Sequence, residues 1–150
     1  MERDNYYKSV ESLLYNYTMF KASIENMEAE IKEIEIEDGL RSLSYENEKT
    51  SCTNEINRST ENIAIRKIEH KDLLKKRIEI IDSKLRRLDN AINALNELEN
   101  KIITKRYFEG KQWYIIAYEL SYNERWCRQV RKQAISKLAI GLYGDIEVLN

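Results

Sequence analysis

A group of basic residues between positions 118 and 134 is the part of the chain whose residue types and spacing could do chemistry. The stretch "YELSYNERWCRQVRKQA" contains Arg125, Arg128, Arg131 and Lys132. A guanidinium is a planar fork of donors that can bind a phosphate or the edge of a guanine through two hydrogen bonds, and an ammonium adds a point charge for phosphate. The segment therefore has the side chains needed to bind a polyanion.

The distribution of charge along the chain supports this interpretation. The formal net charge is -1, with 25 Lys and Arg against 26 Asp and Glu. Residues 101–140 nevertheless hold 9 Lys and Arg against 3 Asp and Glu, whereas residues 1–100 hold 16 against 21. This asymmetry indicates a polyanion-binding module joined to an acidic body.

The other reactive residue types do not form a recognisable site. Cys52, Cys127 and His70 lie far apart with no CxxC spacing, so we expect no metal site. The sequence has no Gly-rich phosphate loop and no Ser/His/Asp set, so we expect no catalytic residues, no cofactor and no enzyme activity. Cys127 is expected to be a small apolar residue of the core.

The segment 97–144 is predicted to contain three helices that position the basic residues. The first ends near Gly110, a second short helix covers "QWYIIAYELS", and the third begins after Asn123, a favourable N-cap residue. Apolar residues at spacings of 3, 4 and 4 form the expected buried stripe of the third helix, namely Cys127, Val130, Ala134 and Leu138. The basic residues fall off that stripe, on the solvent side.

This arrangement is the geometry of a helix-turn-helix, in which a short helix supports a second helix that enters the major groove of double-stranded DNA. The small residues Ala117 and Ala134 are expected to let the two helices approach closely. The residues on the solvent side that are predicted to contact DNA are Arg125, Arg128, Gln129, Arg131 and Lys132. Trp126 of the same helix is expected either to stack on the sugar-phosphate backbone or to pack against Tyr122.

The segment "IAYELSYNERWCRQVRKQAISKL", residues 116–138, resembles the helix-turn-helix of sigma-factor region 4. The positions that match are Ile116, Ala117, Leu120, Asn123, Cys127, Arg128, Ala134, Lys137 and Leu138. Ser121 stands where a turn glycine is common, and Cys127 where valine or isoleucine is usual. The resemblance implies that the last helix contacts promoter DNA, and it places Glu124, Arg125, Arg128, Gln129 and Lys132 at that DNA.

The remainder of the chain is predicted to be two long helices. Apolar residues recur at alternating spacings of 3 and 4 in two stripes: Val10, Leu13, Tyr17, Phe20, Ile24, Met27, Ile31 and Ile34, and then Leu74, Ile78, Ile81, Leu85, Leu88, Ile92 and Leu95. Such stripes are typical of a coiled coil, and a connector at about 38–60, rich in Ser, Thr and Asn, would let the helices pair as an antiparallel hairpin. Because such a hairpin has a thin core, we expect a homo-oligomer.

The predicted fold is therefore all-α, with a coiled-coil body at 1–96, a helix-turn-helix domain at 97–144 and an acidic tail at 145–150. The first residues, "MERDNYYKSVESLL", lack the layout of a signal peptide. No apolar run approaches the roughly 20 residues of a membrane span. We thus expect a cytoplasmic protein with no membrane partner.

The whole layout resembles the small phage late-gene activators of the ArpU/RinA type. This resemblance implies a transcriptional activator of phage or prophage late genes that binds promoter DNA, with RNA polymerase as a further candidate partner. Two alternatives remain open from the sequence. One is a module that binds RNA polymerase or another protein without DNA, and the other is a phage small terminase subunit.

Overall fold

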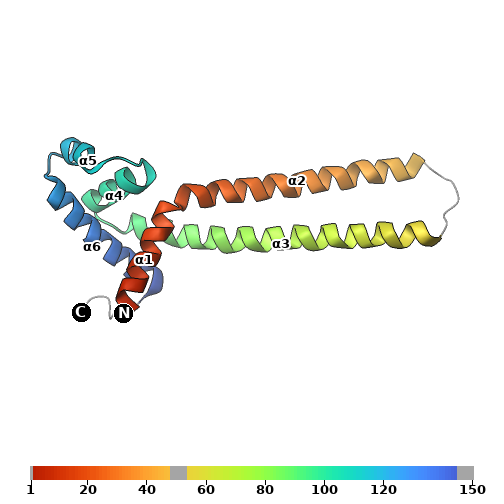
Figure 1. The fold of residues 1–150 in the computed structure, drawn as a ribbon, viewed down its shortest axis with the longest axis horizontal. Helices are drawn as coiled ribbons and strands as arrows, with labels where there is room; N and C mark the ends of the chain where they lie inside the picture. The colour runs from red at the N-terminus through yellow and green to blue at the C-terminus, as the bar shows by residue number, and fades with distance from the viewer. Residues whose placement is uncertain (1, 48–53, 145–150) are drawn as a thin grey trace. The chain divides into compact units, whose positions relative to one another are not determined.

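The computed structural model describes residues 2–47 and 54–144, and the described chain is helical with no strand. Its elements are α1 (Glu2–Tyr15), α2 (Tyr17–Asn47), α3 (Asn54–Asn93), α4 (Glu97–Ile103), the π-helical turn η1 (Thr104–Phe108), α5 (Trp113–Leu120) and α6 (Glu124–Tyr143) (Figure 1). The predicted all-α class is confirmed. The predicted acidic tail, 145–150, lies outside the described residues.

The chain divides into two compact units that differ from the predicted division at residue 96. Residues 21–82, from α2 and α3, form the long-helix unit. Residues 1–20 and 83–150 form the short-helix unit, so α1 and the end of α3 belong with the C-terminal helices. The unit that carries the basic residues is therefore discontinuous in sequence.

The two helices of the long-helix unit run antiparallel, side by side (Figure 1). Side-chain contacts between them show the direction. His70 Nε2 lies 2.7 Å from Glu30 Oε1, and Lys67 Nζ lies 2.6 Å from Glu37 Oε2, so residue numbers rise along one helix as they fall along the other. Ile31 and Leu74 are buried between the helices. The other stripe residues of this unit, Ile24, Met27, Ile34, Ile78 and Ile81, are partly buried.

The prediction of a connector at about 38–60 was wrong at both ends. α2 continues through Asp38 and Gly39 to Asn47, and α3 already begins at Asn54. An Asp-Gly pair favours a turn, but a glycine inside a helix costs only about 1 kcal/mol relative to alanine. Because α2 has many helical residues on both sides of Gly39, the helix continues through the glycine despite this cost.

The predicted first helix is interrupted at Asn16, between α1 and α2. The Nδ2 of Asn16 donates to the backbone oxygen of Ser12 at 2.8 Å, which its own backbone N–H also reaches at 3.1 Å. Asparagine side chains compete in this way with the helical hydrogen-bond ladder. The apolar spacing continues through Asn16 and therefore gave no sign of the interruption.

Caps and close packing position the helices of the short-helix unit. Asn96 caps α4: its side chain accepts from Glu99 N at 2.8 Å, and Glu99 accepts in return from Asn96 N at 3.2 Å. Glu99 is only 3% exposed and also accepts from Lys137 of α6. A Cβ at Gly141 would lie 3.1 Å from Ala91 Cβ, so glycine lets α6 approach α3 closely.

Candidate nucleic-acid interface

A tight turn joins α5 to α6 and fixes the angle at which α6 begins. Ser121 ends α5 in the left-handed conformation, at φ 58° and ψ 36°, where the resembling family commonly has glycine. Tyr122 N donates to Ala117 O at 3.0 Å across the turn. Asn123 then caps α6, because its side chain accepts from Trp126 N at 2.7 Å. The predicted cap is confirmed.

An apolar cluster holds α5 and α6 together beneath this turn. Its buried members are Ile102, Ile116, Ala117, Cys127 and Val130, with Leu98, Trp113 and Leu120 packed against them. The predicted stripe residues Cys127, Val130, Ala134 and Leu138 are all buried. Burial raises the pKa of the Cys127 thiol, so the reactive thiolate is disfavoured. Cys127 is thus a core residue, as predicted.

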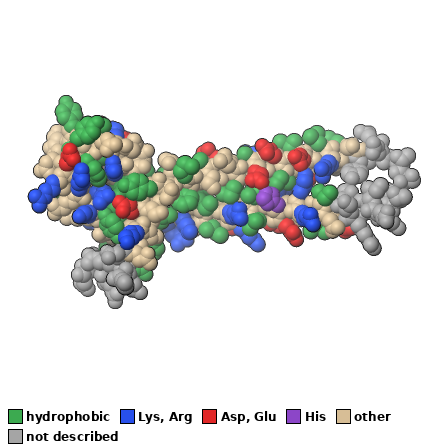
Figure 2. Space-filling view, in the orientation of Figure 1, with side chains coloured by type: hydrophobic (Ala, Val, Ile, Leu, Met, Phe, Trp, Pro, Cys, Tyr) green, Lys and Arg blue, Asp and Glu red, His purple; other side chains and the backbone are tan. Residues whose placement is uncertain are grey.

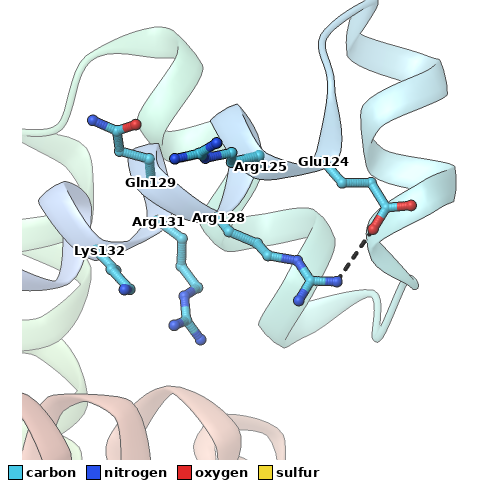
Figure 3. Close-up of a pocket in the computed structure, with 6 residues that line it drawn as sticks. All are labelled: Glu124, Arg125, Arg128, Gln129, Arg131 and Lys132. Carbon is cyan, nitrogen blue, oxygen red and sulfur yellow. Dashed lines mark hydrogen bonds and ion pairs between the residues drawn. The ribbon is translucent and has the colours of Figure 1, made fainter.

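Six of the seven predicted DNA-contacting residues line one open hollow on α6, with a volume of about 730 Å³ (Figure 3). They are Glu124, Arg125, Arg128, Gln129, Arg131 and Lys132. The seventh, Trp126, lies on the same helix, 41% exposed, with its ring centroid 6.5 Å from that of Tyr122. Lys and Arg side chains gather over α6 on the face that Figure 2 shows.

Most residues of the hollow are exposed, as expected for a surface that meets a ligand. Arg125, Gln129 and Lys132 are exposed, as are Glu124 and Arg128. The Nη2 of Arg128 lies 3.2 Å from Glu124 Oε2. Because such a surface pair contributes at most about 1 kcal/mol, a phosphate or a base can replace Glu124 as the partner of Arg128.

Arg131 differs from its neighbours, because its side chain contacts α1. The sequence analysis placed it on the solvent side, but it is only partly exposed. Its side chain is 19% exposed, and its Nη1 lies 2.9 Å from Oε1 of Glu11 on α1. The hydroxyl of Tyr107 donates to the same oxygen at 2.9 Å. Burial raises the pKa of Tyr107 well above its ordinary value despite the nearby Arg131 charge, so this hydroxyl remains a donor.

Three guanidinium groups lie around the ring of Trp113. The ring centroid lies 5.1 Å from the Cζ of Arg106, 5.6 Å from that of Arg128 and 5.8 Å from that of Arg131. Each contact is within the range of a cation–π interaction, which offsets part of the repulsion between like charges. Trp113 therefore helps to hold the basic hollow together, a role that the sequence analysis did not assign.

Sequence reasoning also missed Glu11 and its neighbours on α1. Tyr7, Glu11 and Tyr15 recur at a spacing of 4, which places them on one helical face. Tyr15 packs edge-on against Tyr107, with ring centroids 4.7 Å apart. This four-residue spacing is present in the sequence, but the sequence analysis considered only the apolar stripe of the predicted first helix, which includes Val10 and Tyr17.

The described residues offer little support for other chemistry. Across 2–47 and 54–144, no group of three or more His, Cys, Asp or Glu side chains could hold a metal ion. In the same ranges, no helix combines the length and the apolar character needed to cross a membrane. The candidate site is the hollow on α6, because its lining brings six charged or amide side chains together. Comparison of the chain with models of protein families, with curated proteins and with solved structures gave no match.

Proposed function

We propose that this protein is a sequence-specific DNA-binding transcription regulator that places α6 in the major groove. The observation that carries the proposal is the hollow on α6, where exposed basic and amide side chains come together on one capped helix. The major groove, about 12 Å wide, admits one α-helix. α5 and the turn at Ser121 supply the support that a helix-turn-helix requires.

The residues of the hollow suit two kinds of contact. Arg125, Arg128 and Gln129 lie in the first two turns of α6, and these side chain types form paired hydrogen bonds with guanine or adenine edges. Lys132 lies one turn further on and suits a phosphate. The resemblance to sigma-factor region 4 and to the ArpU/RinA activators points to promoter DNA and to phage or prophage late genes as the targets.

Alanine substitutions in α6 test this proposal. Arg125→Ala and Arg128→Ala should each weaken binding to the target promoter by about 1–3 kcal/mol if these side chains contact bases. The measurement is fluorescence anisotropy or mobility shift. The duplexes are taken from the DNA upstream of the gene that encodes this protein and from phage late promoters. Lys101→Ala, which removes an exposed cation from α4, is the control and should bind like the parent. A double variant that binds as tightly as the parent would contradict the assignment.

A second candidate function, protein binding without DNA, is favoured by a row of exposed aromatic side chains. Tyr114, Tyr118 and Tyr122 are 65%, 87% and 47% exposed and recur every four residues, with Trp126 next in the series. Hydrophobic side chains also project over α5 in Figure 2. Tyr and Trp are enriched at protein interfaces. Purified RNA polymerase that binds the parent, but not a Tyr114→Ser/Tyr118→Ser variant, in the absence of DNA would favour this function.

A further inference from the structure

We propose that Glu11 neutralises Arg131 and withholds it from the DNA, so that the N-terminal helix limits the sequence-independent affinity of α6. This inference rests on the proposed function and assigns Glu11 and Arg131 a role in setting its sequence-independent affinity. Glu11 lies on α1, and Arg131 lies 120 residues further along the chain on α6. Both belong to the short-helix unit.

The geometry ties Arg131 to the interior of the unit. Glu11 Oε1 accepts from Arg131 Nη1 and from the Tyr107 hydroxyl, both at 2.9 Å, and the side chains of Arg131 and Glu11 are 19% and 25% exposed. Among the described residues, the buried Arg131 Nε and Tyr7 Oη have no hydrogen-bond partner. Arg131 Nη1 also lies 3.4 Å from the Tyr107 hydroxyl oxygen, and its Cζ lies 5.8 Å from the Trp113 ring centroid. Glu11 adds to these contacts the carboxylate that compensates the charge of this guanidinium.

The pair changes what α6 offers to a phosphate backbone. Arg131 lines the same hollow as Arg125, Arg128 and Lys132, yet the Glu11 carboxylate cancels its charge. A cation that contacts phosphate strengthens binding to every sequence alike, whereas base contacts distinguish sequences. Withholding one cation therefore lowers the sequence-independent part of the affinity and leaves base contacts with a larger share of the total binding free energy.

Glu11→Gln separates charge from shape. Glutamine keeps an acceptor oxygen for Tyr107 and Arg131 but leaves the guanidinium charge uncompensated. The released cation should steepen the slope of log K against log salt by about 0.9, and it should raise affinity for a mixed-sequence duplex about fivefold at 0.15 M salt. The measurement is anisotropy with a random duplex of about 30 base pairs between about 50 and 200 mM NaCl.

Two further variants make the result decisive. Glu97→Gln removes an exposed carboxylate that pairs with Lys101 on α4, and it controls for the change in total charge. The double variant Glu11→Gln/Arg131→Gln removes both charges of the pair and should keep the parent slope. Circular dichroism identifies a temperature at which Glu11→Gln keeps the helical content of the parent, and the slopes of all variants are compared at that temperature.

The outcomes are distinguishable. A steeper slope for Glu11→Gln, with parent-like slopes for Glu97→Gln and for the double variant, supports the inference. An unchanged slope for a folded Glu11→Gln variant overturns it, and so does a double variant whose slope is shallower by about 0.9, because Arg131 would then contact phosphate in the parent. A parent protein that shows no salt-dependent DNA binding would instead refute the proposed function.

Discussion

The ring of Trp113 lies close to three guanidinium groups, two of which, those of Arg128 and Arg131, line the candidate site. The guanidiniums of Arg106, Arg128 and Arg131 carry like charges, and the negative face of the ring offsets part of their repulsion. Cation–π contacts contribute about 0.5–1 kcal/mol each at exposed sites. A single residue at the start of α5 therefore affects both the stability of the unit and the geometry of its basic surface.

Replacement of Trp113 by leucine should consequently reduce stability and DNA binding together. We expect the free energy of unfolding to fall by about 1–3 kcal/mol, because leucine fills part of the volume but offers no ring face to the arginines. Urea denaturation followed by circular dichroism measures the loss. Trp126→Leu, at an exposed position, is the matched control and should cost less than about 0.5 kcal/mol. Equal losses for the two variants would contradict the role of Trp113.

The cap of α6 gives a second prediction at a single residue. Asn123→Ala removes the acceptor for Trp126 N and should lower the free energy of unfolding by about 1 kcal/mol. Asn123→Asp keeps an acceptor and should be nearly neutral. Thermal or urea denaturation of both variants checks this. An alanine variant as stable as the aspartate variant would show that the side-chain cap contributes nothing measurable.

At the scale of elements, α1 is a structural part of the unit that carries α6. Val10 and Leu14 of α1 are fully buried, although the sequence analysis placed them in a separate coiled-coil body. Leu14→Ala should cost about 2–5 kcal/mol and should also weaken DNA binding, since α6 loses a supporting surface. Met19→Ala, at a residue 67% exposed, is the control. If Leu14→Ala leaves unfolding unchanged, α1 does not pack as described.

Local signals explain which elements could be predicted from the sequence. The buried stripe from Cys127 to Leu138 and the exposure of Arg125, Arg128, Gln129 and Lys132 follow from spacing within one helix, and Asn123 follows from its preference for the N-cap. The pairing of Glu11 with Arg131 could not be predicted, because it depends on packing between helices distant in sequence. The extension of α2 through Asp38 and Gly39 was missed, because the turn preference of the Asp-Gly pair is weaker than the tendency of the long surrounding helix to continue.

At the scale of the whole molecule, self-association remains a prediction, and the long-helix unit now offers specific residues for it. Ile36 and Leu40 on α2, and Ile65 and Ile68 on α3, are 62%, 64%, 47% and 56% exposed. Exposed apolar residues at helical spacing favour association, and pairing two chains would let two copies of α6 engage neighbouring half-sites.

We therefore expect the parent to sediment as a dimer or larger species at tens of micromolar. Ile36→Glu/Leu40→Glu should shift it toward monomer without loss of helix, because both side chains lie off the buried stripe. Leu85→Asp/Leu88→Asp would be a poor test, since Leu88 is fully buried within the short-helix unit and its replacement would unfold that unit. A monomeric parent would show that the exposed apolar residues are merely tolerated.

The discontinuous short-helix unit has a consequence for the order in which the protein acquires its structure during synthesis. A ribosome that adds about 5–20 residues per second needs about 6–24 s to proceed from Glu11 to Arg131. During that interval α1 has been translated but lacks its final partner, and both helices of the long-helix unit are completed before α6 is translated. The nascent chain therefore depends on the antiparallel α2 and α3 to bring α1 and α6 together. Until α6 has been translated, chaperones have a defined interval in which to recognise the unpaired apolar face of α1.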